Sequence, residues 1–241
     1  MISENILREK LATCTRIFAM EGMLGVFGHV SIYQPESGRI LITPGGASDK
    51  ATTQAAELLA VDLSGHVLDG ANQLPIEWPI HTALHRARED ALAVAHLHAP
   101  YSTLFAIARR EFRPVTLQGA IFGEGVPLYT EANLIKTATQ SQRLAAVLGD
   151  KRAARLRGHG IVVVGQDIEE MLFASLVLED DSHKAMQAAT LGELEFISPE
   201  ECRAFEAHVN LRRRAHRAWH YFATLESRWD RQPGTSAGPL A

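Results

Sequence analysis

The feature that most constrains the fold is the apolar run Ala91–Ala95, which leads into His96-Leu97-His98. A short uninterrupted apolar run of this kind is typical of a buried β-strand. Residues two apart in a strand point to the same face, so both imidazoles leave the sheet on one side. Neutral imidazole is a good ligand for zinc and neighbouring transition metals. The run therefore predicts a buried strand that ends in two candidate metal ligands, His96 and His98. The alternative is that each histidine only forms structural hydrogen bonds.

Composition limits the classes of protein to which the chain can belong. Its 241 residues suffice for one α/β domain or two small ones. A formal net charge of −4 gives no basic surface for nucleic acid, and no apolar run reaches the ~18 residues that cross a bilayer. We therefore expect no nucleic-acid partner and no membrane. Only two cysteines, Cys14 and Cys202, and an N-terminus without a secretory signal favour a cytoplasmic location.

Hydrophobic periodicity predicts the order of the secondary-structure elements. Helices are expected at about 3–24, 77–89, 102–108, 131–148, 167–190 and 198–229, and strands at 29–33, 39–43, 58–61, 66–68, 91–97, 114–117, 126–129, 155–156 and 161–164. The early strands form hairpins and the later ones alternate with helices. This order indicates a mainly antiparallel sheet covered by helices on both faces. We expect a single domain over residues 1–230 and a flexible tail over 231–241, which has the composition of a linker.

A third candidate ligand is His159, which stands between Gly158 and Gly160. Glycines on both sides allow the backbone to turn sharply and to approach another group closely. The alternative is a tight turn whose central histidine has no chemical role. With His96 and His98 it would complete three protein nitrogens and leave coordination positions open, which is the pattern of a catalytic metal site.

Glu77 opens the predicted helix that precedes the metal strand, and His81 and His85 follow on the same helical face. A carboxylate in the first turn complements the helix dipole, which is the structural interpretation. The functional interpretation is a general base, or a group that occupies an open metal position.

Two short segments could bind the anionic part of a substrate through backbone N–H groups. One contains Gly28, His29 and Ser31, and the other contains Thr43, Gly45 and Gly46. The alternative for both is ordinary hairpin and turn chemistry, and for either segment alone it is the simpler interpretation.

A basic run near the C-terminus comprises Arg212–Arg214 and Arg217. Such a run is typical of a solvated helix face. Because arginine binds carboxylates through two parallel hydrogen bonds, Arg214 is also a candidate clamp for a substrate carboxylate at the site of a neighbouring subunit.

Five motifs occur in the order found in the class II aldolase/adducin family, which this sequence resembles. They are Gly28–Ser31, Leu41–Gly46, Glu77–His81, Ala93–His98 and Gly158–Gly160. The resemblance covers most of the chain, from about residue 5 to residue 190. The separation of 19 residues between Glu77 and His96 is that of the family's fuculose-phosphate and ribulose-phosphate members.

The resemblance implies an α/β/α sandwich around a mainly antiparallel sheet, assembled as a homotetramer with active sites at subunit interfaces. It also implies one divalent metal per subunit, held by His96, His98 and His159, with Glu77 as the acid/base. Three histidines suit Zn, Mn, Fe and Co almost equally, so the metal is left open. Adducin-like members have lost this chemistry, and retention of all four residues indicates an enzyme acting on a small acidic molecule.

Departures from the family pattern bear on the reaction. Pro75-Ile76 stand where sugar-phosphate aldolases carry hydroxyl residues that hold phosphate, and His29 stands where asparagine is usual. Leu117-Gln118 occupy the region of an aldolase tyrosine. In this respect the chain is similar to family members that decarboxylate hydroxylated aromatic or heteroaromatic dicarboxylates.

The first hypothesis is therefore a metal-dependent, non-oxidative decarboxylase of such an acid, acting through an enolate. The alternatives are an aldolase of a non-phosphorylated hydroxy-ketoacid or sugar, a non-catalytic adducin-like module, and an iron-dependent oxygenase. Aldol cleavage and decarboxylation both break a C–C bond and leave an electron pair that a Lewis acid stabilises.

Overall fold

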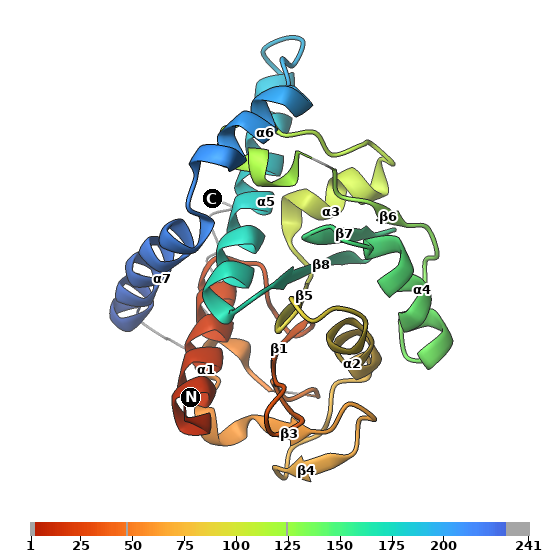
Figure 1. The fold of residues 1–241 in the computed structure, drawn as a ribbon, viewed down its shortest axis with the longest axis vertical. Coiled ribbons are helices and arrows are strands. Elements are labelled where there is room, and N and C mark those ends of the chain that lie inside the picture. The colour runs from red at the N-terminus through yellow and green to blue at the C-terminus, as the bar shows by residue number, and fades with distance from the viewer. Residues whose placement is uncertain (1–2, 47, 124, 230–241) are drawn as a thin grey trace.

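The structure is a computed structural model that describes residues 3–46, 48–123 and 125–229. Its elements, in chain order, are α1 (Glu4–Met20), β1 (His29–Gln34), β2 (Arg39–Ile42), the 3-10 helices η1 (Lys50–Thr52) and η2 (Ala55–Glu57), β3 (Leu59–Val61), β4 (Val67–Asp69), α2 (Trp78–Ala87), β5 (Ala93–Leu97), α3 (Pro100–Ile107), η3 (Gly119–Phe122), β6 (Leu128–Tyr129), α4 (Ala138–Leu148), β7 (Ala153–Leu156), β8 (Gly160–Gly165), α5 (Ile168–Ala189), α6 (Pro199–His208) and α7 (Leu211–Arg228) (Figure 1). The predicted tail over 231–241 lies outside the described residues.

The strands form one sheet in the order β4-β3-β2-β1-β5-β8-β7-β6. Every neighbouring pair is antiparallel except β6 and β7, which are parallel. The strand that ends in the histidine pair, β5, lies in the middle of the sheet between β1 and β8. The prediction of a mainly antiparallel sheet inside an α/β/α sandwich is confirmed.

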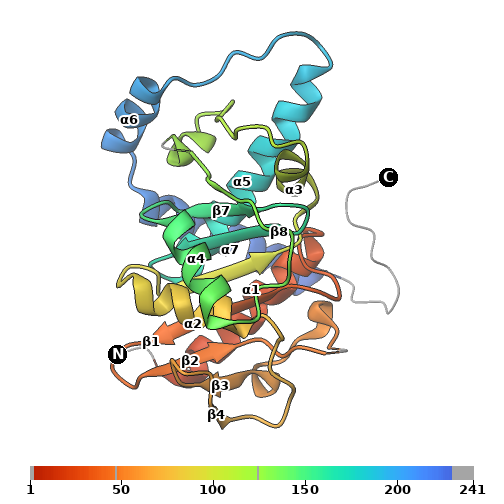
Figure 2. The same ribbon diagram turned by 90° about the vertical axis from the view of Figure 1, so that its right-hand side faces the viewer.

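Helices cover the two faces of the sheet as two separate layers. Figure 2 shows α2 and α4 on the side nearer the viewer, with α5 and α7 behind the sheet. In β5, Ala93, Ala95 and Leu97 face the large core shared with α1 and α5. Val94 faces the second core, shared with α2 and α4. Because the side-chain period of a strand is two, His96 points to the same side as Val94, toward α2.

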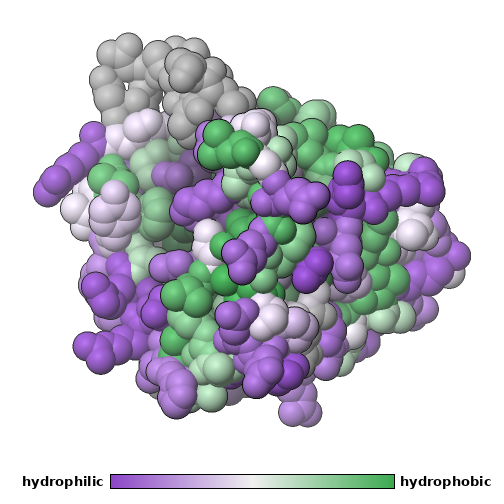
Figure 3. Space-filling view, turned by 90° about the horizontal axis from the view of Figure 1, so that it is seen from above, coloured by the Kyte–Doolittle hydropathy of each residue, from purple (hydrophilic) through white to green (hydrophobic). Residues whose placement is uncertain are grey.

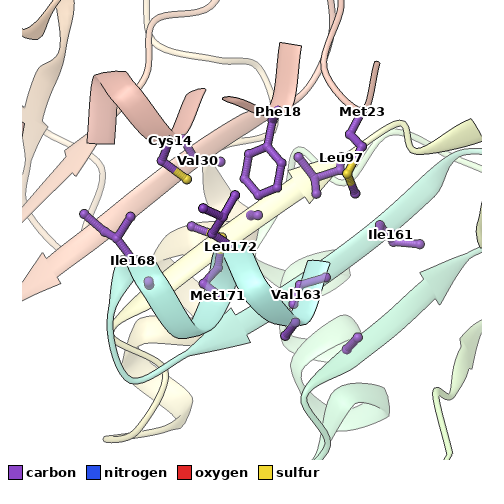
Figure 4. Packing of buried hydrophobic residues seen from close by; sticks show 14 of the residues in the cluster. Cys14, Phe18, Met23, Val30, Leu97, Ile161, Val163, Ile168, Met171 and Leu172 are labelled. Atoms are coloured by element: carbon purple, nitrogen blue, oxygen red, sulfur yellow. The ribbon is translucent and has the colours of Figure 1, made fainter. Parts of the chain in front are cut away.

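The larger core is made of apolar side chains, including those from α1, β1, β5, β8 and α5, and Figure 4 shows part of this cluster at close range. Phe18 and Leu172 are fully buried there. The apolar residues that contribute to this cluster extend along the chain from Leu7 to Ala223. The single domain expected for residues 1–230 stays a prediction. Among the described residues, no helix is both long enough and apolar enough to pass through a lipid bilayer.

Two of the predicted elements are wrong. The expected helix over 198–229 is divided into α6 and α7, because Val209 is extended and the side chain of Asn210 caps α7 by accepting a hydrogen bond from the N–H of Arg213 (2.9 Å). No strand forms over 114–117. The N–H groups of Val115 and Thr116 instead donate to the buried carboxylate of Asp181 (3.1 and 2.9 Å).

Other boundaries shift without changing the architecture. The helix expected from residue 131 begins only at Ala138. Thr137 and Gln140 form a reciprocal capping box there, which satisfies the N–H groups at the start of α4. The first helix ends at Met20, before Gly22 takes up a left-handed conformation (φ +69°).

The core position of Leu172 makes a direct prediction about stability. Replacing a fully buried leucine by alanine removes apolar contacts and leaves a cavity, so Leu172→Ala should lower the free energy of unfolding by about 2–5 kcal/mol. Leu191→Ala is the matched control, because Leu191 is 91% exposed and its loss should change stability by less than about 0.5 kcal/mol. Urea unfolding followed by circular dichroism measures both, and equal effects would contradict the assignment of this core.

Candidate metal centre

The structure brings His96, His98 and His159 together. His96 is the fourth residue of β5, His98 follows the strand, and His159 occupies the turn between β7 and β8. The ring centroids are 4.8 to 5.1 Å apart in all three pairs. One ligand nitrogen from each ring lies within 4.8 Å of the others. His96 is fully buried, whereas His98 and His159 are partly exposed, so the cluster is reached from one side.

The glycines that flank His159 explain how the turn reaches the end of β5. Gly158 adopts a left-handed conformation (φ +64°), which glycine accepts without strain. A Cβ on Gly160 would lie 2.2 Å from the carbonyl oxygen of Leu97. Only glycine allows β8 to start this close to β5. The two glycines therefore serve the close approach that places His159 beside His98.

The hydrogen bonds of the three rings leave nitrogen lone pairs in the centre of the cluster. Nδ1–H of His96 donates to the carbonyl of Ile161 (3.1 Å), so its Nε2 carries a lone pair, 3.3 Å from Nε2 of His98. Burial, together with the neighbouring His96 and His159 rings, lowers the pKa of His98 to about 4 and keeps this ring neutral. Nε2 of His159 is buried without a hydrogen-bond partner among the described residues. Three converging nitrogens, one of them unpartnered, fit a divalent metal ion.

Glu77 closes the cluster from the N-terminal end of α2. Its Oε2 lies 3.3 Å from Nε2 of His159 and 3.5 Å from Nε2 of His96. Its Oε1 accepts a hydrogen bond from the N–H of Ile135 (2.7 Å). Burial alone would raise the pKa of this carboxyl, but the adjoining rings of His159 and His96 and the hydrogen bond from the Ile135 N–H hold it well below its usual range. The group is therefore a carboxylate, able to balance a cation or to accept a proton.

Behind the cluster, a row of buried polar side chains joins α2 to β1. His29 contacts His81 (Nδ1 to Nε2, 2.6 Å), and Ser31 contacts both His81 (2.6 Å) and His85 (2.8 Å). The sequence placed His81 and His85 on the helical face of Glu77 but assigned them no role, and it placed Ser31 in a different segment. The available signal was their helical spacing, with His81 four residues after Glu77 and His85 four residues after His81. The approach of α2 to β1 that joins them is a property of the tertiary fold.

The segment Thr43–Gly46, predicted to bind an anion, has already used part of its hydrogen-bonding capacity. The Thr43 hydroxyl is fully buried and bonds with the backbone of Val30. The N–H of Gly45 donates to the carbonyl of Gln73 (2.8 Å). These two groups therefore contribute to the structure of the turn, and a role for them in binding a substrate anion stays a prediction. Gly46, which adopts φ +70°, keeps its place as a candidate.

Two further residues lie near this site: Gly28, which the sequence analysis predicted to bind an anion, and Lys50, which it did not mention. Gly28 (φ +91°) was expected among the anion-binding residues, and a Cβ there would lie 2.9 Å from the carbonyl of His96, so its conformation serves the packing of β1 against β5. Lys50 was not singled out in the sequence. It is buried and donates to the carbonyl of Pro44 and to the hydroxyl of Ser48. Burial lowers the pKa of this ammonium group to about 8.

Arg214 is not brought to the metal centre of its own chain. It lies on α7 with its guanidinium over the ring of Phe205 (5.0 Å to the centroid). The α7 helix packs on the core shared with α1 and α5, on the face of the sheet away from His96. A role for Arg214 at a neighbouring subunit's site stays a prediction.

A hollow on the surface that the structure describes is also separate from the histidine cluster. It measures about 610 Å³ and lies between α2 and α4, with Trp78, Arg86 and Lys136 among its lining residues. None of the three clustered histidines lines it. The geometry of the imidazoles, and not the size of a hollow, therefore identifies the candidate site.

Comparison with known proteins assigns the chain to a family. Residues 9–186 match the family described as Class II Aldolase and Adducin N-terminal domain. The chain belongs to this family. It is 28% identical over 198 residues to a 3,4-dihydroxyphthalate decarboxylase from Arthrobacter keyseri, which covers 77% of this chain and 79% of that protein. It is 27% identical over 177 residues to an L-fuculose phosphate aldolase from Methanocaldococcus jannaschii, covering 73% and 92%.

The solved structures agree on the fold. An aldolase II superfamily protein from Pseudomonas syringae matches with a TM-score of 0.83 at 24% identity, over 94% of this chain and 95% of that one. Decarboxylases and aldolases both cleave carbon–carbon bonds, so the family comparison supports a lyase. Relatives of both kinds are similar to the chain, one releasing carbon dioxide and the other an aldehyde.

The contact between Gly160 and Leu97 predicts the effect of a single methyl group. Gly160→Ala places a Cβ against the Leu97 carbonyl and should lower the free energy of unfolding by about 1–3 kcal/mol through overpacking. Gly25→Ala is the matched control, because nothing lies within 4 Å of its Cβ position. Urea unfolding of both variants measures the difference. Equal stability of the two would show that β8 does not need this close approach.

Proposed function

We propose that the protein is a metal-dependent, non-oxidative decarboxylase of a small hydroxylated aromatic or heteroaromatic carboxylate. The observation that carries the proposal is the cluster of His96, His98 and His159 closed by Glu77. Similarity to a 3,4-dihydroxyphthalate decarboxylase supports this choice of substrate class.

His96, His98 and His159 would hold one divalent ion of zinc, manganese, iron or cobalt, because neutral imidazoles suit all four. Such an ion supplies Lewis-acid stabilisation of the negative charge that develops on a substrate oxygen. The Ile161 carbonyl fixes the tautomer of His96, so this ring presents Nε2 without rearrangement.

Glu77 is the residue we assign to acid/base work. The Ile135 N–H holds its Oε1, so Oε2 is the atom that faces the histidines. In decarboxylation the bond between the ring carbon and the carboxylate breaks, carbon dioxide leaves, and the electron pair stays on the ring carbon and its enolate. One proton must then reach that carbon. Because Glu77 is a carboxylate, it would first take up a proton from the ring hydroxyl of the substrate or from water, and Glu77 or a water molecule that it orients would then deliver one proton to that carbon.

An aromatic side chain at the edge of the cluster supports an aromatic substrate. The ring of Phe27 stacks on His98 with centroids 5.9 Å apart and planes inclined by 26°. Phe27 is nevertheless 69% exposed, so most of its surface is free to contact another ring. Stacking of aromatic rings contributes about 0.5–1.5 kcal/mol beyond the burial of area.

Aldol cleavage is the second candidate, because the L-fuculose phosphate aldolase from Methanocaldococcus jannaschii is 27% identical to the chain. The segment before Glu77 does not favour a phosphate ligand. Pro75 packs its backbone against Gly45, where a Cβ would lie only 2.7 Å from the Pro75 Cα, and Ile76 is apolar and 63% exposed.

We also propose that the chain works as a homotetramer with active sites at subunit interfaces. Large apolar side chains are exposed beside the cluster, with Val26 at 68% and Phe27 at 69%. Figure 3 shows hydrophobic patches among hydrophilic residues on the face seen from above. Contact with another subunit would cover surfaces of this kind.

The metal assignment predicts a loss of bound metal in a single-ligand variant. The wild-type protein should retain about one divalent ion per chain after dialysis, and His159→Ala should retain almost none. Metal content by plasma mass spectrometry is the measurement. His66→Ala is the control, because the His66 side chain is 79% exposed and pairs with Asp62, away from the three-histidine cluster. Full metal content in His159→Ala would remove His159 from the site.

The reaction assignment predicts carbon dioxide release from ortho-hydroxy aromatic acids. A panel of hydroxylated benzene and pyridine dicarboxylates, with Mn²⁺, Zn²⁺, Fe²⁺ or Co²⁺ added in turn, should include at least one acid that is decarboxylated. Glu77→Gln should reduce turnover about 10²–10⁴-fold while keeping the metal. Glu36→Gln, in the exposed turn after β1, should change neither. Turnover of a sugar phosphate, without carbon dioxide from any acid on the panel, would contradict the proposal.

A further inference from the structure

The row of buried polar groups behind the metal centre is continuous from a backbone carbonyl to His29. His85 Nδ1 contacts the carbonyl of Ala91 (2.7 Å), and His85 Nε2 contacts Ser31 Oγ (2.8 Å). Ser31 Oγ contacts His81 Nδ1 (2.6 Å), and His81 Nε2 contacts His29 Nδ1 (2.6 Å). The residues come from β1, from α2 and from the segment just before β5, and these three elements lie together in Figure 1.

The direction of every hydrogen bond in this row follows from its first member. A carbonyl oxygen can only accept, so Nδ1–H of His85 donates to Ala91. A neutral His85 then has a lone pair on Nε2, which accepts the hydroxyl proton of Ser31. Ser31 Oγ in turn accepts from Nδ1–H of His81, and Nε2 of His81 accepts from Nδ1–H of His29. One carbonyl thus leaves His29 with its lone pair on Nε2.

This order of hydrogen bonds requires the three imidazoles to be neutral, and their burial favours the neutral state. Burial, with the charges of the neighbouring histidines, holds the pKa of His29 and of His81 well below the usual range. Burial lowers the pKa of His85 to about 4, against a smaller opposing effect of the Ala91 carbonyl. Each of the three rings therefore has one N–H and one lone pair near neutral pH.

The lone pair of His29 is available at the edge of the metal centre. His29 is only 6% exposed, and one of its ring nitrogens lies within 4.8 Å of ligand atoms of Glu77 and His96. Nδ1 is taken by His81, and within the described ranges no side chain forms a hydrogen bond with Nε2. Because His29 keeps 6% exposure and its Nε2 is not among the fully buried unpartnered atoms, this nitrogen is open to a hydrogen-bond donor that enters the site.

His29 is not needed as a further metal ligand. The set of His29, Glu77 and His96 is separate from the three-histidine set and shares only His96 with it. His96 has one free nitrogen, because Nδ1–H donates to Ile161, and one lone pair serves one cation. If that cation sits among the three histidines, His29 stands beside it and faces whatever is bound there.

We propose that His29 accepts a hydrogen bond at Nε2 from a hydroxyl group of the substrate, and that His81, Ser31 and His85 are positioning residues that hold the accepting tautomer. The inference rests on the proposed function in that the substrate is a hydroxy acid. It explains the buried row of three imidazoles and a serine, which the metal centre itself does not require. Among acids of similar shape, the row selects those with a hydroxyl near the metal.

The tautomer is tested first, without turnover. In ¹⁵N-histidine protein, long-range proton–nitrogen correlation should show His29 protonated at Nδ1 and bare at Nε2, with the signal assigned by its loss in His29→Gln. Ser31→Ala breaks the row and should abolish this single pattern. A proton found on Nε2 of His29 in the wild-type protein would overturn the inference.

Recognition of the hydroxyl is tested by binding of two probes, salicylate and benzoate, to metal-loaded protein by calorimetry. The wild-type preference for salicylate should fall about 10-fold in His29→Leu and in Ser31→Ala, and His29→Gln, which keeps an acceptor oxygen, should recover part of it. Metal content should stay unchanged in all three variants. Loss of metal in His29→Leu would make His29 a ligand instead, and an unchanged preference, or no binding of salicylate to the wild type, would also overturn the inference.

These readouts are independent of the reaction. A protein that shows the tautomer and the hydroxyl preference but releases no carbon dioxide would contradict the proposed decarboxylase and leave the role of His29 supported. A decarboxylase whose salicylate preference does not depend on His29 would contradict only this inference.

Discussion

A buried neutral imidazole has one proton to donate and one lone pair to offer, and this constraint orders the whole candidate site. Two backbone carbonyls accept such protons and so decide which ring nitrogen keeps the lone pair. Ile161 accepts the proton of His96, and Ala91 accepts the proton of His85. The first leaves a lone pair toward the three-histidine cluster, and the second, through Ser31 and His81, leaves one on His29. Proton positions in the site are thus set by main-chain geometry, which is the part of the fold that side-chain motion disturbs least.

The sheet makes this possible by dividing β5 between two environments. Ala93, Ala95 and Leu97 complete an apolar core, whereas His96 on the opposite face meets α2 and its glutamate. Antiparallel pairing with β1 sets His29 opposite His96, and pairing with β8 sets Ile161 opposite Leu97. The same register that closes the core therefore brings the polar groups into one place. A shift of one residue in this register would exchange the two faces of β5 and would disrupt both the apolar core and the candidate site.

The sequence predicted those parts of the site that depend on residues close together in the chain, and it missed those that depend on contacts between distant segments. The period of a strand placed His96 and His98 on one side, and two glycines marked His159. The link from His29 through His81 to Ser31 was missed, because it joins residues 50 and 52 positions apart in the chain through the packing of α2 on β1. The strand expected at 114–117 failed for a similar reason, since Asp181, far along the chain, takes the N–H groups that a sheet would use. The break at Asn210 was local, but a capping asparagine within a helical pattern is a weak signal.

The balance of donors and acceptors around the cluster is the argument behind our proposal of a hydroxylated acid, in place of a sugar phosphate, as the substrate. A phosphate offers only acceptors at its charged oxygens, and it needs N–H and O–H groups that are free. In this chain the Thr43 hydroxyl and the Gly45 N–H already serve the protein, and Lys50 directs two of its hydrogen bonds to Pro44 and Ser48. Glu77 and His29 instead present acceptors. A substrate that complements them must bring its own acidic protons, and a phenolic hydroxyl beside a carboxylate does so.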